Sequence, residues 1–338
     1  MTHHLVDSPS LLEERVISVA LPENYVNSDT EHPVLYVLDG ETVFDYSVGA
    51  AAFLSNEYGY LPEVIVVSIP NTDRAKDFYA PLAAPAYDRF ADFLEMDVFP
   101  LIDNNYRTNG FRVLYGWSSS SGANMHLMTK RPALIDAHIL SGSGIGANDE
   151  KFITDNYDEG DFENVFLFAN CEKGVRETGL NRFKDLMEEL APKTMTYSFE
   201  VIESTHVGVL AEGLFKGLNF VFGDYYLSDE VIDGGYSSIV SYYENLSSKY
   251  GYEVQIPLGA INETAGILID NDQIEDAEKL LKLGVEEYPF SHLPHGALAS
   301  LYKAQKMEQE AKKYFESALS KSTNDLPSYY RYKSLIKD

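Results

Sequence analysis

Short apolar runs alternate with helical patterns along the first two thirds of the chain. The runs are β-branched or alternate with polar residues, as strands do, and most end at turn residues. They predict strands over 14–21, 33–38, 63–69, 111–115, 137–140, 164–169 and 196–202. Helical spacing predicts helices over 90–106, 123–130, 182–190 and 209–222, and Pro100 is expected to kink the first of them or to end its first half. This alternation indicates an α/β fold with a mainly parallel sheet covered on both faces.

The last third of the chain carries only helical patterns, with a break at Gly234-Gly235. Four pairs of residues match in size at an offset of 34: Leu268/Tyr302, Ala277/Ala311, Leu281/Phe315 and Gly284/Ala318. This period resembles that of tetratricopeptide helix pairs and predicts two units, 261–289 and 293–324, after a tyrosine-rich helix over 236–252. We therefore expect an α/β domain over 1–226 and a helical, tetratricopeptide-like domain over 227–338.

The formal net charge of −27 changes the picture of possible partners, because so acidic a surface repels nucleic acid and anionic membranes. No apolar run is long enough to span a bilayer, and the N-terminus lacks the features of a signal peptide. We expect a cytoplasmic protein, or a periplasmic one if a signal peptide has been removed. The single cysteine, Cys171, excludes an internal disulfide.

Candidate chemistry lies at the carboxyl ends of the predicted strands, where parallel sheets form their sites. The strand at 111–115 runs into Gly116-Trp117-Ser118, three places of the nucleophile-elbow pattern G-x-S-x-G, although Ser120 stands at the fifth place. Glu172 and His206 follow two later strands, so the order is serine, acid, histidine. For each residue a plainer interpretation stays open: a serine-rich helix cap, a solvated glutamate, a packing histidine.

These segments resemble the putative-esterase branch of the α/β hydrolases, which includes enterobactin-type siderophore esterases and S-formylglutathione hydrolase (esterase D). The resemblance runs from about residue 13 to 222. It rests on Pro33-Val-Leu-Tyr-Val-Leu-Asp-Gly40, on Asn71-Thr-Asp-Arg74 with Asp77-Phe78 and Pro81, on Phe99-Pro-Leu-Ile-Asp103 with Tyr106-Arg-Thr108, on Arg112 before Gly116-Trp-Ser118, and on Ser204-Thr-His206. It implies an α/β-hydrolase fold for the first domain.

The resemblance also implies roles for individual residues. Ser118 would be the nucleophile, His206 the base and Glu172 the acid of a triad, and the backbone N–H groups of Ser119 and Glu41 would form the oxyanion hole. The family usually has Gly-His-Ser-x-Gly-Gly, whereas this chain has Trp117, Ser120 and Ser121 at the histidine and the last two glycines. Ser120 therefore stays open as a rival nucleophile. Glycine at 120 is expected to be tolerated, with equal or higher activity.

The resulting hypothesis is a serine esterase that needs no cofactor and no metal, because no cluster has metal-ligand spacing. Its substrates would be small-molecule carboxylic esters or thioesters, siderophore-type lactones among them, cleaved through an acyl-enzyme. The alternative is a hydrolase fold that has lost catalysis and binds a protein through its helical repeats. In either case the repeats are candidates for a homodimer contact. His126 and His138 are interpreted as packing residues, and His3-His4 as part of a mobile terminus.

Overall fold

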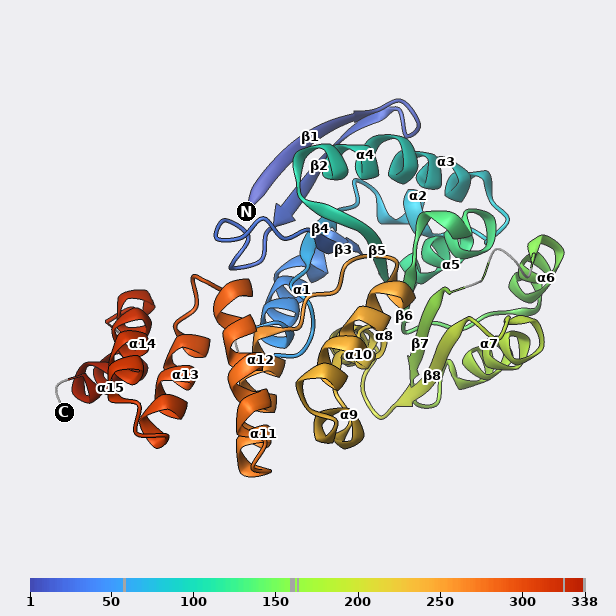
Figure 1. Ribbon diagram of the computed structural model, residues 1–338. Coiled ribbons are helices and arrows are strands. Elements are labelled where there is room, and N and C mark those ends of the chain that lie inside the picture. Colours follow the sequence, from blue (N-terminus) through green and yellow to red (C-terminus); the bar gives the residue numbers. More distant parts are fainter. Residues whose placement is uncertain (57–58, 159–161, 163, 325, 337–338) are drawn as a thin grey trace. The chain divides into compact units, whose positions relative to one another are not determined.

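The computed structural model describes residues 1–56, 59–158, 162, 164–324 and 326–336. The chain divides into two compact units (Figure 1). The first, here called the hydrolase unit, contains residues 1–25, 29–53 and 63–223; the second, here called the helical unit, contains 26–28, 54–62 and 224–338. No helix in the described ranges has both the length and the apolar character needed to cross a membrane.

The hydrolase unit is built on an eight-stranded sheet with the order β1-β2-β4-β3-β5-β6-β7-β8. Its strands are β1 (Thr2–Ser8), β2 (Glu13–Ala20), β3 (His32–Leu38), β4 (Ile65–Ile69), β5 (Thr108–Trp117), β6 (Ala137–Ser141), β7 (Phe166–Glu172) and β8 (Thr196–Ile202). β1 and β2 pair antiparallel and β2 is antiparallel to β4, whereas the strands from β4 to β8 are parallel to their neighbours. The predicted mainly parallel sheet is confirmed.

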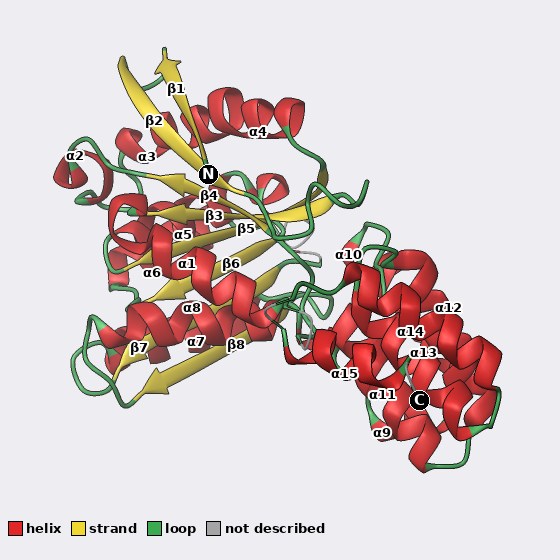
Figure 2. Ribbon diagram, turned by 90° about the vertical axis from the view of Figure 1, so that its left-hand side faces the viewer, coloured by secondary structure: helices red, strands yellow, loops and turns green. Residues whose placement is uncertain are grey.

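Helices connect these strands: α1 (Gly40–Leu54), α2 (Arg74–Phe78), α3 (Pro85–Phe93), α4 (Phe99–Asn105), α5 (Ser120–Lys130), α6 (Ala147–Asn156), α7 (Glu177–Leu190) and α8 (Gly208–Val221). The β3–α1–β4 connection moves along the sheet in the opposite direction from the later connections. Right-handed crossovers therefore place α1 on one face of the sheet and α4 to α7 on the other. α8 returns to the face of α1, where Tyr46 donates a 2.8 Å hydrogen bond to the carbonyl of Ala211 (Figure 2).

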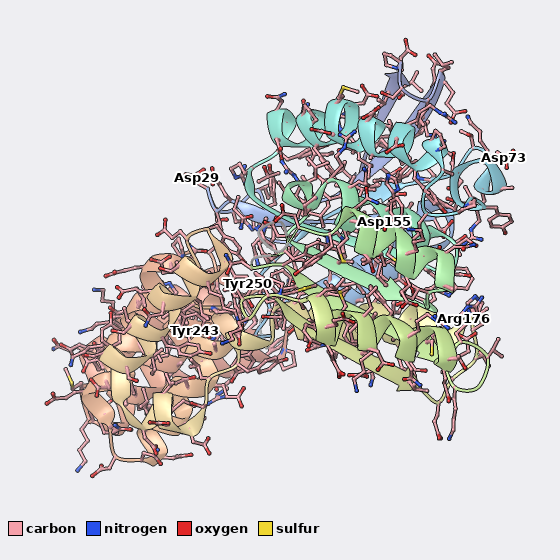
Figure 3. All side chains as sticks on the ribbon, turned by 90° about the vertical axis from the view of Figure 1, so that its right-hand side faces the viewer. Asp29, Asp73, Asp155, Arg176, Tyr243 and Tyr250 are labelled. Carbon is pink, nitrogen blue, oxygen red and sulfur yellow. The ribbon has the colours of Figure 1, made fainter. Side chains whose placement is uncertain are left out.

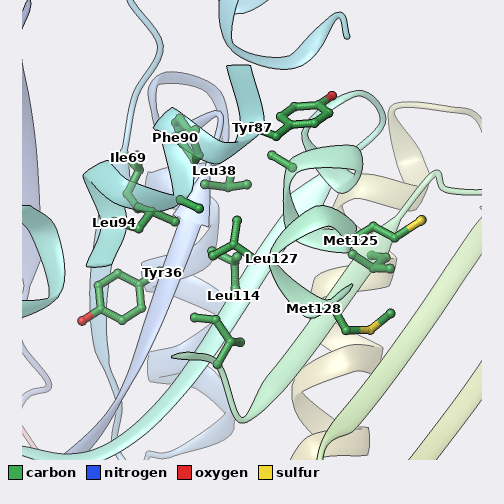
Figure 4. Packing of buried hydrophobic residues seen from close by; sticks show 14 of the residues in the cluster. Tyr36, Leu38, Ile69, Tyr87, Phe90, Leu94, Leu114, Met125, Leu127 and Met128 are labelled. Atoms are coloured by element: carbon green, nitrogen blue, oxygen red, sulfur yellow. The ribbon is translucent and has the colours of Figure 1, made fainter. Parts of the chain in front are cut away.

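The core lies between the sheet and its helices. Every residue of β3, β4, β6 and β7 is buried, as expected for strands covered on both faces. Figure 4 shows a part of this core, in which Leu127 of α5 lies near Leu114 of β5. A helix whose two sides meet the sheet and α3 cannot move independently, so the turn that precedes α5 has a rigid support.

The helix expected over 90–106 is divided into α3, a π-helical turn over Leu94–Val98, and α4; Pro100, which lacks an N–H, is the second residue of α4. Two features depart from the sequence prediction. The helices α1, α2 and α6 were not predicted. His3 and His4 belong to β1 rather than to a mobile terminus. Nε2 of His4 lies 2.6 Å from the hydroxyl of Tyr106, and Nδ1 of His3 lies 2.8 Å from the hydroxyl of Ser18. These contacts, which no local pattern reveals, fix the edge strand.

The helical unit consists of α9 (Asp229–Asp233), α10 (Gly235–Tyr250), α11 (Leu258–Asp270), α12 (Ile274–Glu287), α13 (His292–Ala304), α14 (Glu308–Lys321) and α15 (Pro327–Leu335). The expected all-helical region is confirmed. α11 pairs with α12 and α13 pairs with α14, and the eight residues matched at the offset of 34 are buried in these hairpins.

The turns of the two hairpins have the same backbone conformation. Asp272 and Lys306, 34 residues apart, both adopt a left-handed conformation, with φ of 62° and 63°. The next N–H in each hairpin closes the same turn: Gln273 donates to the carbonyl of Leu268 at 2.8 Å, and Met307 donates to that of Tyr302 at 2.9 Å. The offset seen in the sequence is thus a structural repeat.

Neither end of this pair of hairpins is left without a neighbouring helix. The tyrosine-rich helix α10 packs against α12, and α15 packs against α14. Tyr243 of α10 is buried and donates a 2.7 Å hydrogen bond to the carbonyl of Tyr225. Since helical hairpins need neighbours to bury their apolar faces, α10 and α15 serve as caps of a short stack.

Candidate active site

The serine turn between β5 and α5 has the backbone shape of a nucleophile elbow. Ser118 has a φ of 57°, a strained value for a residue with a side chain. Its N–H donates a 2.8 Å hydrogen bond to the carbonyl of Ser141, which joins the elbow to the neighbouring strand β6. Gly116 leaves room for the turn, because a Cβ there would lie 2.8 Å from the carbonyl oxygen of Ser120. The strain therefore falls on the serine that the sequence pattern selects.

Ser118, His206 and Glu172 form one hydrogen-bonded chain across the ends of β5, β8 and β7. The hydroxyl of Ser118 lies 3.0 Å from Nε2 of His206. Nδ1 of the same ring lies 3.2 Å from Oε1 of Glu172, which is buried at the last residue of β7. With its proton on Nδ1, His206 accepts from the serine and donates to the glutamate. The structure thus brings together three residues that are far apart in the sequence.

Glu172 stays ionised in this setting. Burial by itself raises its pKa, but hydrogen bonds from the backbone and from His206, together with the charge of Arg176, outweigh burial and lower the pKa. Nη1 of Arg176 donates a 2.5 Å hydrogen bond to Oε1 of Glu172 and lies 3.1 Å from Nδ1 of His206. The second oxygen, Oε2, is buried and has no partner among the described residues.

Trp117, which stands where the resembled family usually has histidine, contacts His206 twice. Its indole N–H donates a 3.0 Å hydrogen bond to the backbone carbonyl of His206. The two rings also lie 5.0 Å apart with planes 30° from parallel. Gly142, at the end of β6, gives the imidazole its space, because a Cβ there would lie 2.9 Å from Cε1 of His206. The position of His206 is therefore fixed from two sides.

Ser120 and Ser121 use their hydroxyls inside the fold. The hydroxyl of Ser120 is buried, accepts from the N–H of Trp117 at 2.8 Å and lies 2.8 Å from Oδ2 of Asp39. Arg74 and Asn71 donate further hydrogen bonds to the same carboxylate. The hydroxyl of Ser121 lies within hydrogen-bond distance of two backbone carbonyls, those of Gly116 and Ser141. The two serines at glycine positions therefore brace the elbow.

A pocket of about 530 Å³ opens beside Ser118. Its wall combines apolar side chains with the elbow, the loop after β6 and the start of α7. The lining residues are Phe78, Tyr79, Ala80, Pro81, Leu82, Tyr87, Ser118, Ser119, Ser121, Gly122, Met125, Gly142, Ser143, Gly144, Asp149 and Arg176. A cavity of this size holds a small organic molecule next to the serine hydroxyl.

The two residues expected to supply oxyanion donors lie in different surroundings. Ser119 lines the pocket beside Ser118. Glu41 lies in the first turn of α1 and lines a separate pocket of about 290 Å³. Its carboxylate accepts hydrogen bonds from the backbone and the side chain of Asn71, which also donates to Asp39.

The other histidines singled out in the sequence are packed inside the fold. His126 is buried and contacts the carbonyl of Leu82 and the carboxylate of Asp88. His138 is buried in β6 with Nδ1 2.6 Å from the side-chain oxygen of Asn124, and burial lowers its pKa to about 3. In the described part of the chain, no three His, Cys, Asp or Glu side chains are grouped to hold a metal ion.

Residues 8–153 match the family model described as Putative esterase. This part of the chain, less than half of its length, is similar to that esterase family. The matched region contains β2 to β6 and the serine elbow, whereas Glu172 and His206 lie beyond its end. The match supports an ester hydrolase, and by itself it does not identify the acid or the histidine. No curated protein sequence matches the esterase.

Solved structures extend this result to the fold. An IroE-like serine hydrolase from Shewanella oneidensis is 27% identical over 84% of this chain and 99% of its own, with a TM-score of 0.70. An uncharacterised protein from Capnocytophaga ochracea is 16% identical over 99% of this chain and 98% of its own, with a TM-score of 0.67. A siderophore hydrolase from Aspergillus nidulans is 18% identical over 66% of this chain and 94% of its own, with a TM-score of 0.55. The α/β-hydrolase fold is confirmed.

Sequence reasoning missed four residues that touch this site or its supports. Asp39 was seen only as part of a Leu-Asp-Gly segment, although it is the carboxylate to which Ser120 and Arg74 bind. The contacts of Trp117 and Gly142 with His206 depend on spatial neighbours. Arg176 carried one usable signal: it lies four residues after Glu172, close enough for an ion pair at the start of a helix.

Proposed function

We propose that the chain is a serine hydrolase in which Ser118, His206 and Glu172 act as a catalytic triad. The observation that carries this proposal is the 3.0 Å contact between the Ser118 hydroxyl and Nε2 of His206, made by a serine with a φ of 57°. That combination of a strained turn and a base within reach serves nucleophilic catalysis and has no evident use in a helix cap.

The proposed reaction proceeds through an acyl-enzyme. His206 takes the proton of Ser118 as its oxygen attacks the ester carbonyl, and the imidazolium then gives that proton to the leaving alcohol. Glu172 keeps the ring in the required tautomer and stabilises its positive charge, which suits a carboxyl whose pKa is lowered. Water, activated by the same histidine, then cleaves the acyl-enzyme and regenerates the serine.

The N–H groups of Ser119 and Glu41 are the proposed oxyanion donors. Each lies at the start of a helix, where N–H groups have no intrahelical acceptor and the helix dipole favours negative charge. A donor of this kind contributes about 3–4 kcal/mol of transition-state stabilisation. Asp39 supports this assignment of the two donors. Its carboxylate binds the hydroxyl of Ser120, the residue after Ser119, and Asp39 itself lies two residues before Glu41.

The proposed substrates are small-molecule carboxylic esters or thioesters, including lactones of the siderophore type. The size of the pocket and its apolar wall fit such molecules. One of the structures that share this fold is a siderophore hydrolase from Aspergillus nidulans, so siderophores belong among the substrates to be tested. Since fold likeness does not fix the substrate, a panel of esters is the appropriate assay.

Steady-state hydrolysis of 4-nitrophenyl butyrate tests the triad. Replacement of Ser118 or His206 by alanine should each lower kcat by at least about a thousandfold, and the double replacement should lower it little further, because the two residues act as a unit. Circular dichroism checks that each variant is folded. Additive losses, or a Ser118→Ala variant that keeps most of its activity, would contradict the proposal.

The alternative proposal, a hydrolase fold that works only as a protein-binding module, is favoured by the capped helical hairpins alone. We propose that these hairpins form a separate domain that mediates a homodimer or binds a protein, as tetratricopeptide-like repeats do. Light scattering of the full chain and of a chain ending at residue 226 tests the dimer, with loss of dimer mass expected on truncation. An unchanged mass would favour a protein partner instead.

A further inference from the structure

Arg176 places a positive charge on the wall of the pocket that contains Ser118. Among the described residues that line this pocket it is the one cation. Figure 3 shows Arg176 at the beginning of α7, the helix of 14 residues that its backbone caps. The partial positive charge of that helix end adds to the charge of the side chain. In a chain of net charge −27 such a site is unexpected, and the mechanism of the triad does not need it.

The guanidinium of Arg176 is held in one orientation but is only partly used. Its Nη1 binds Glu172 at 2.5 Å, whereas its Nε and Nη2 have no hydrogen-bond acceptor among the described residues. The side chain is 35% exposed and lines the pocket. A planar guanidinium that is held in place through Nη1 can bind a carboxylate through its other N–H groups.

The acidic residue on the same wall does not neutralise this group. Oδ2 of Asp149 accepts a 2.9 Å hydrogen bond from the N–H of Gly146, at the start of α6. Its charge therefore stabilises that helix end. Glu172 is shared between Arg176 and His206, so when the imidazolium forms, one carboxylate faces two cations.

An anion bound to Arg176 would change the energetics of the triad itself. Nη1 of Arg176 lies 3.1 Å from Nδ1 of His206, so the charge of the guanidinium repels the positive charge that the ring carries during the proposed reaction. Negative charge on the free side of the guanidinium offsets that repulsion in the step in which His206 becomes positive. An anionic substrate would thus gain in kcat as well as in binding.

We propose that the pocket selects esters that carry a carboxylate or a similar anionic group, which Arg176 binds beside Ser118. This inference rests on the proposed serine-hydrolase function and names the chemical class of its substrate. The imidazole of His206 separates Arg176 from the serine hydroxyl, so the anionic group lies about one ring width from the scissile bond.

Two matched pairs of esters test the selectivity. The acyl-side pair is mono(4-nitrophenyl) adipate and its terminal amide; the alcohol-side pair is 4-acetoxybenzoate and 4-acetoxybenzamide. We expect kcat/KM to favour the anion by roughly 10- to 100-fold in at least one pair, as charge-assisted hydrogen bonds do. In the Arg176→Gln variant this ratio should fall to about one, and in Arg176→Lys it should take an intermediate value.

Lys173→Gln is the matched control, because it removes the same charge three residues away. Lys173 is 63% exposed, pairs with Glu203 and does not line the pocket. Its anionic-to-neutral ratio should equal that of the unmodified chain. If neither pair favours the anion, or if the preference survives in Arg176→Gln, the inference is overturned.

A binding measurement separates this inference from the proposed chemistry. In the Ser118→Ala variant the fluorescence of Trp117, the single tryptophan, reports ligands near His206. The anionic ester of the favoured pair should bind more tightly than its amide, and Arg176→Gln added to this variant should abolish the difference. Equal Kd values would overturn the anion site. Absence of hydrolysis in the unmodified chain would instead overturn the triad and leave the binding result to stand on its own.

Discussion

The hydroxyl of Ser120 lies 2.8 Å from Oδ2 of Asp39, which joins the serine elbow to the end of β3. The sequence places serine where related elbows have glycine, so a side chain has to find room in a tight turn. It does so because its hydroxyl is directed to a buried carboxylate and also accepts a hydrogen bond from the N–H of Trp117. The substitution therefore adds a brace between the two segments proposed to carry the oxyanion donors.

Removal of the Ser120 hydroxyl should weaken both the fold and the activity. Ser120→Ala leaves the N–H of Trp117 without its acceptor and deprives Asp39 of a donor, a loss of about 1–3 kcal/mol in the free energy of unfolding. Ser120→Gly should lose about 0.5–1 kcal/mol more, since glycine is costly in the helical conformation that begins α5. We expect kcat/KM to fall several-fold in both. The structure thus reverses the expectation that glycine is tolerated; a Ser120→Gly variant with unchanged urea midpoint and rate would restore it.

Trp117 should act as a positioning residue for His206. Trp117→Phe keeps an aromatic ring near the imidazole but removes the N–H that binds the His206 carbonyl at 3.0 Å. Because small displacements of a general base have large effects on rate, we expect kcat to fall about tenfold with KM nearly unchanged. Steady-state kinetics with a neutral aryl ester measures both constants. A change in KM alone would assign Trp117 to substrate binding instead.

Gly142 should be irreplaceable for reasons of space. Alanine there would put a Cβ 2.9 Å from Cε1 of His206, at a residue whose φ is 58°. We expect Gly142→Ala to lower kcat at least tenfold by displacing the ring, with the fold retained in circular dichroism. Gly49→Ala is the control, because nothing lies within 4 Å of the added carbon in α1 and helical alanine is favourable. Equal activity of the two variants would show that the imidazole of His206 does not need the space at Gly142 for catalysis.

Much of this arrangement was predictable from local patterns. Seven of the strands and the helices α3, α4, α5, α7 and α8 follow from apolar periodicity, whereas α1, α2 and α6 were not predicted. The hairpins of the helical unit follow from the offset of 34. Ser118, Glu172 and His206 are candidates from the sequence because each follows a strand of a parallel sheet, which gathers their side chains at one edge.

What the sequence did not reveal depends on contacts between distant segments. The edge strand β1 has no apolar run of its own and is held by β2 and by Tyr106. Asp39 becomes the centre of a hydrogen-bond network only when β3 and β5 lie side by side. A pattern along the chain carries no information about such partners, so the brace at Ser120 could not be foreseen.

His138 should make the hydrolase unit sensitive to mild acid. Burial lowers its pKa to about 3, below its ordinary value of 6.5. Between these two values His138 binds a proton in the unfolded chain but not in the folded chain. The free energy of unfolding therefore falls as the pH drops from about 6.5 toward 3. Between pH 7 and pH 5 this contributes a loss of about 2 kcal/mol. His138→Gln should show a correspondingly smaller loss in urea unfolding followed by Trp117 fluorescence; an equal loss in both proteins would contradict the assignment.

The nucleophile is identified most directly by the site of covalent labelling. A fluorophosphonate reacts with a serine only when a neighbouring base activates it, and peptide mass spectrometry then locates the adduct. The account predicts one adduct, on Ser118, that is absent in Ser118→Ala, strongly slowed in His206→Ala and retained in Ser120→Ala. An adduct on Ser120, or no adduct on the folded protein, would contradict the account.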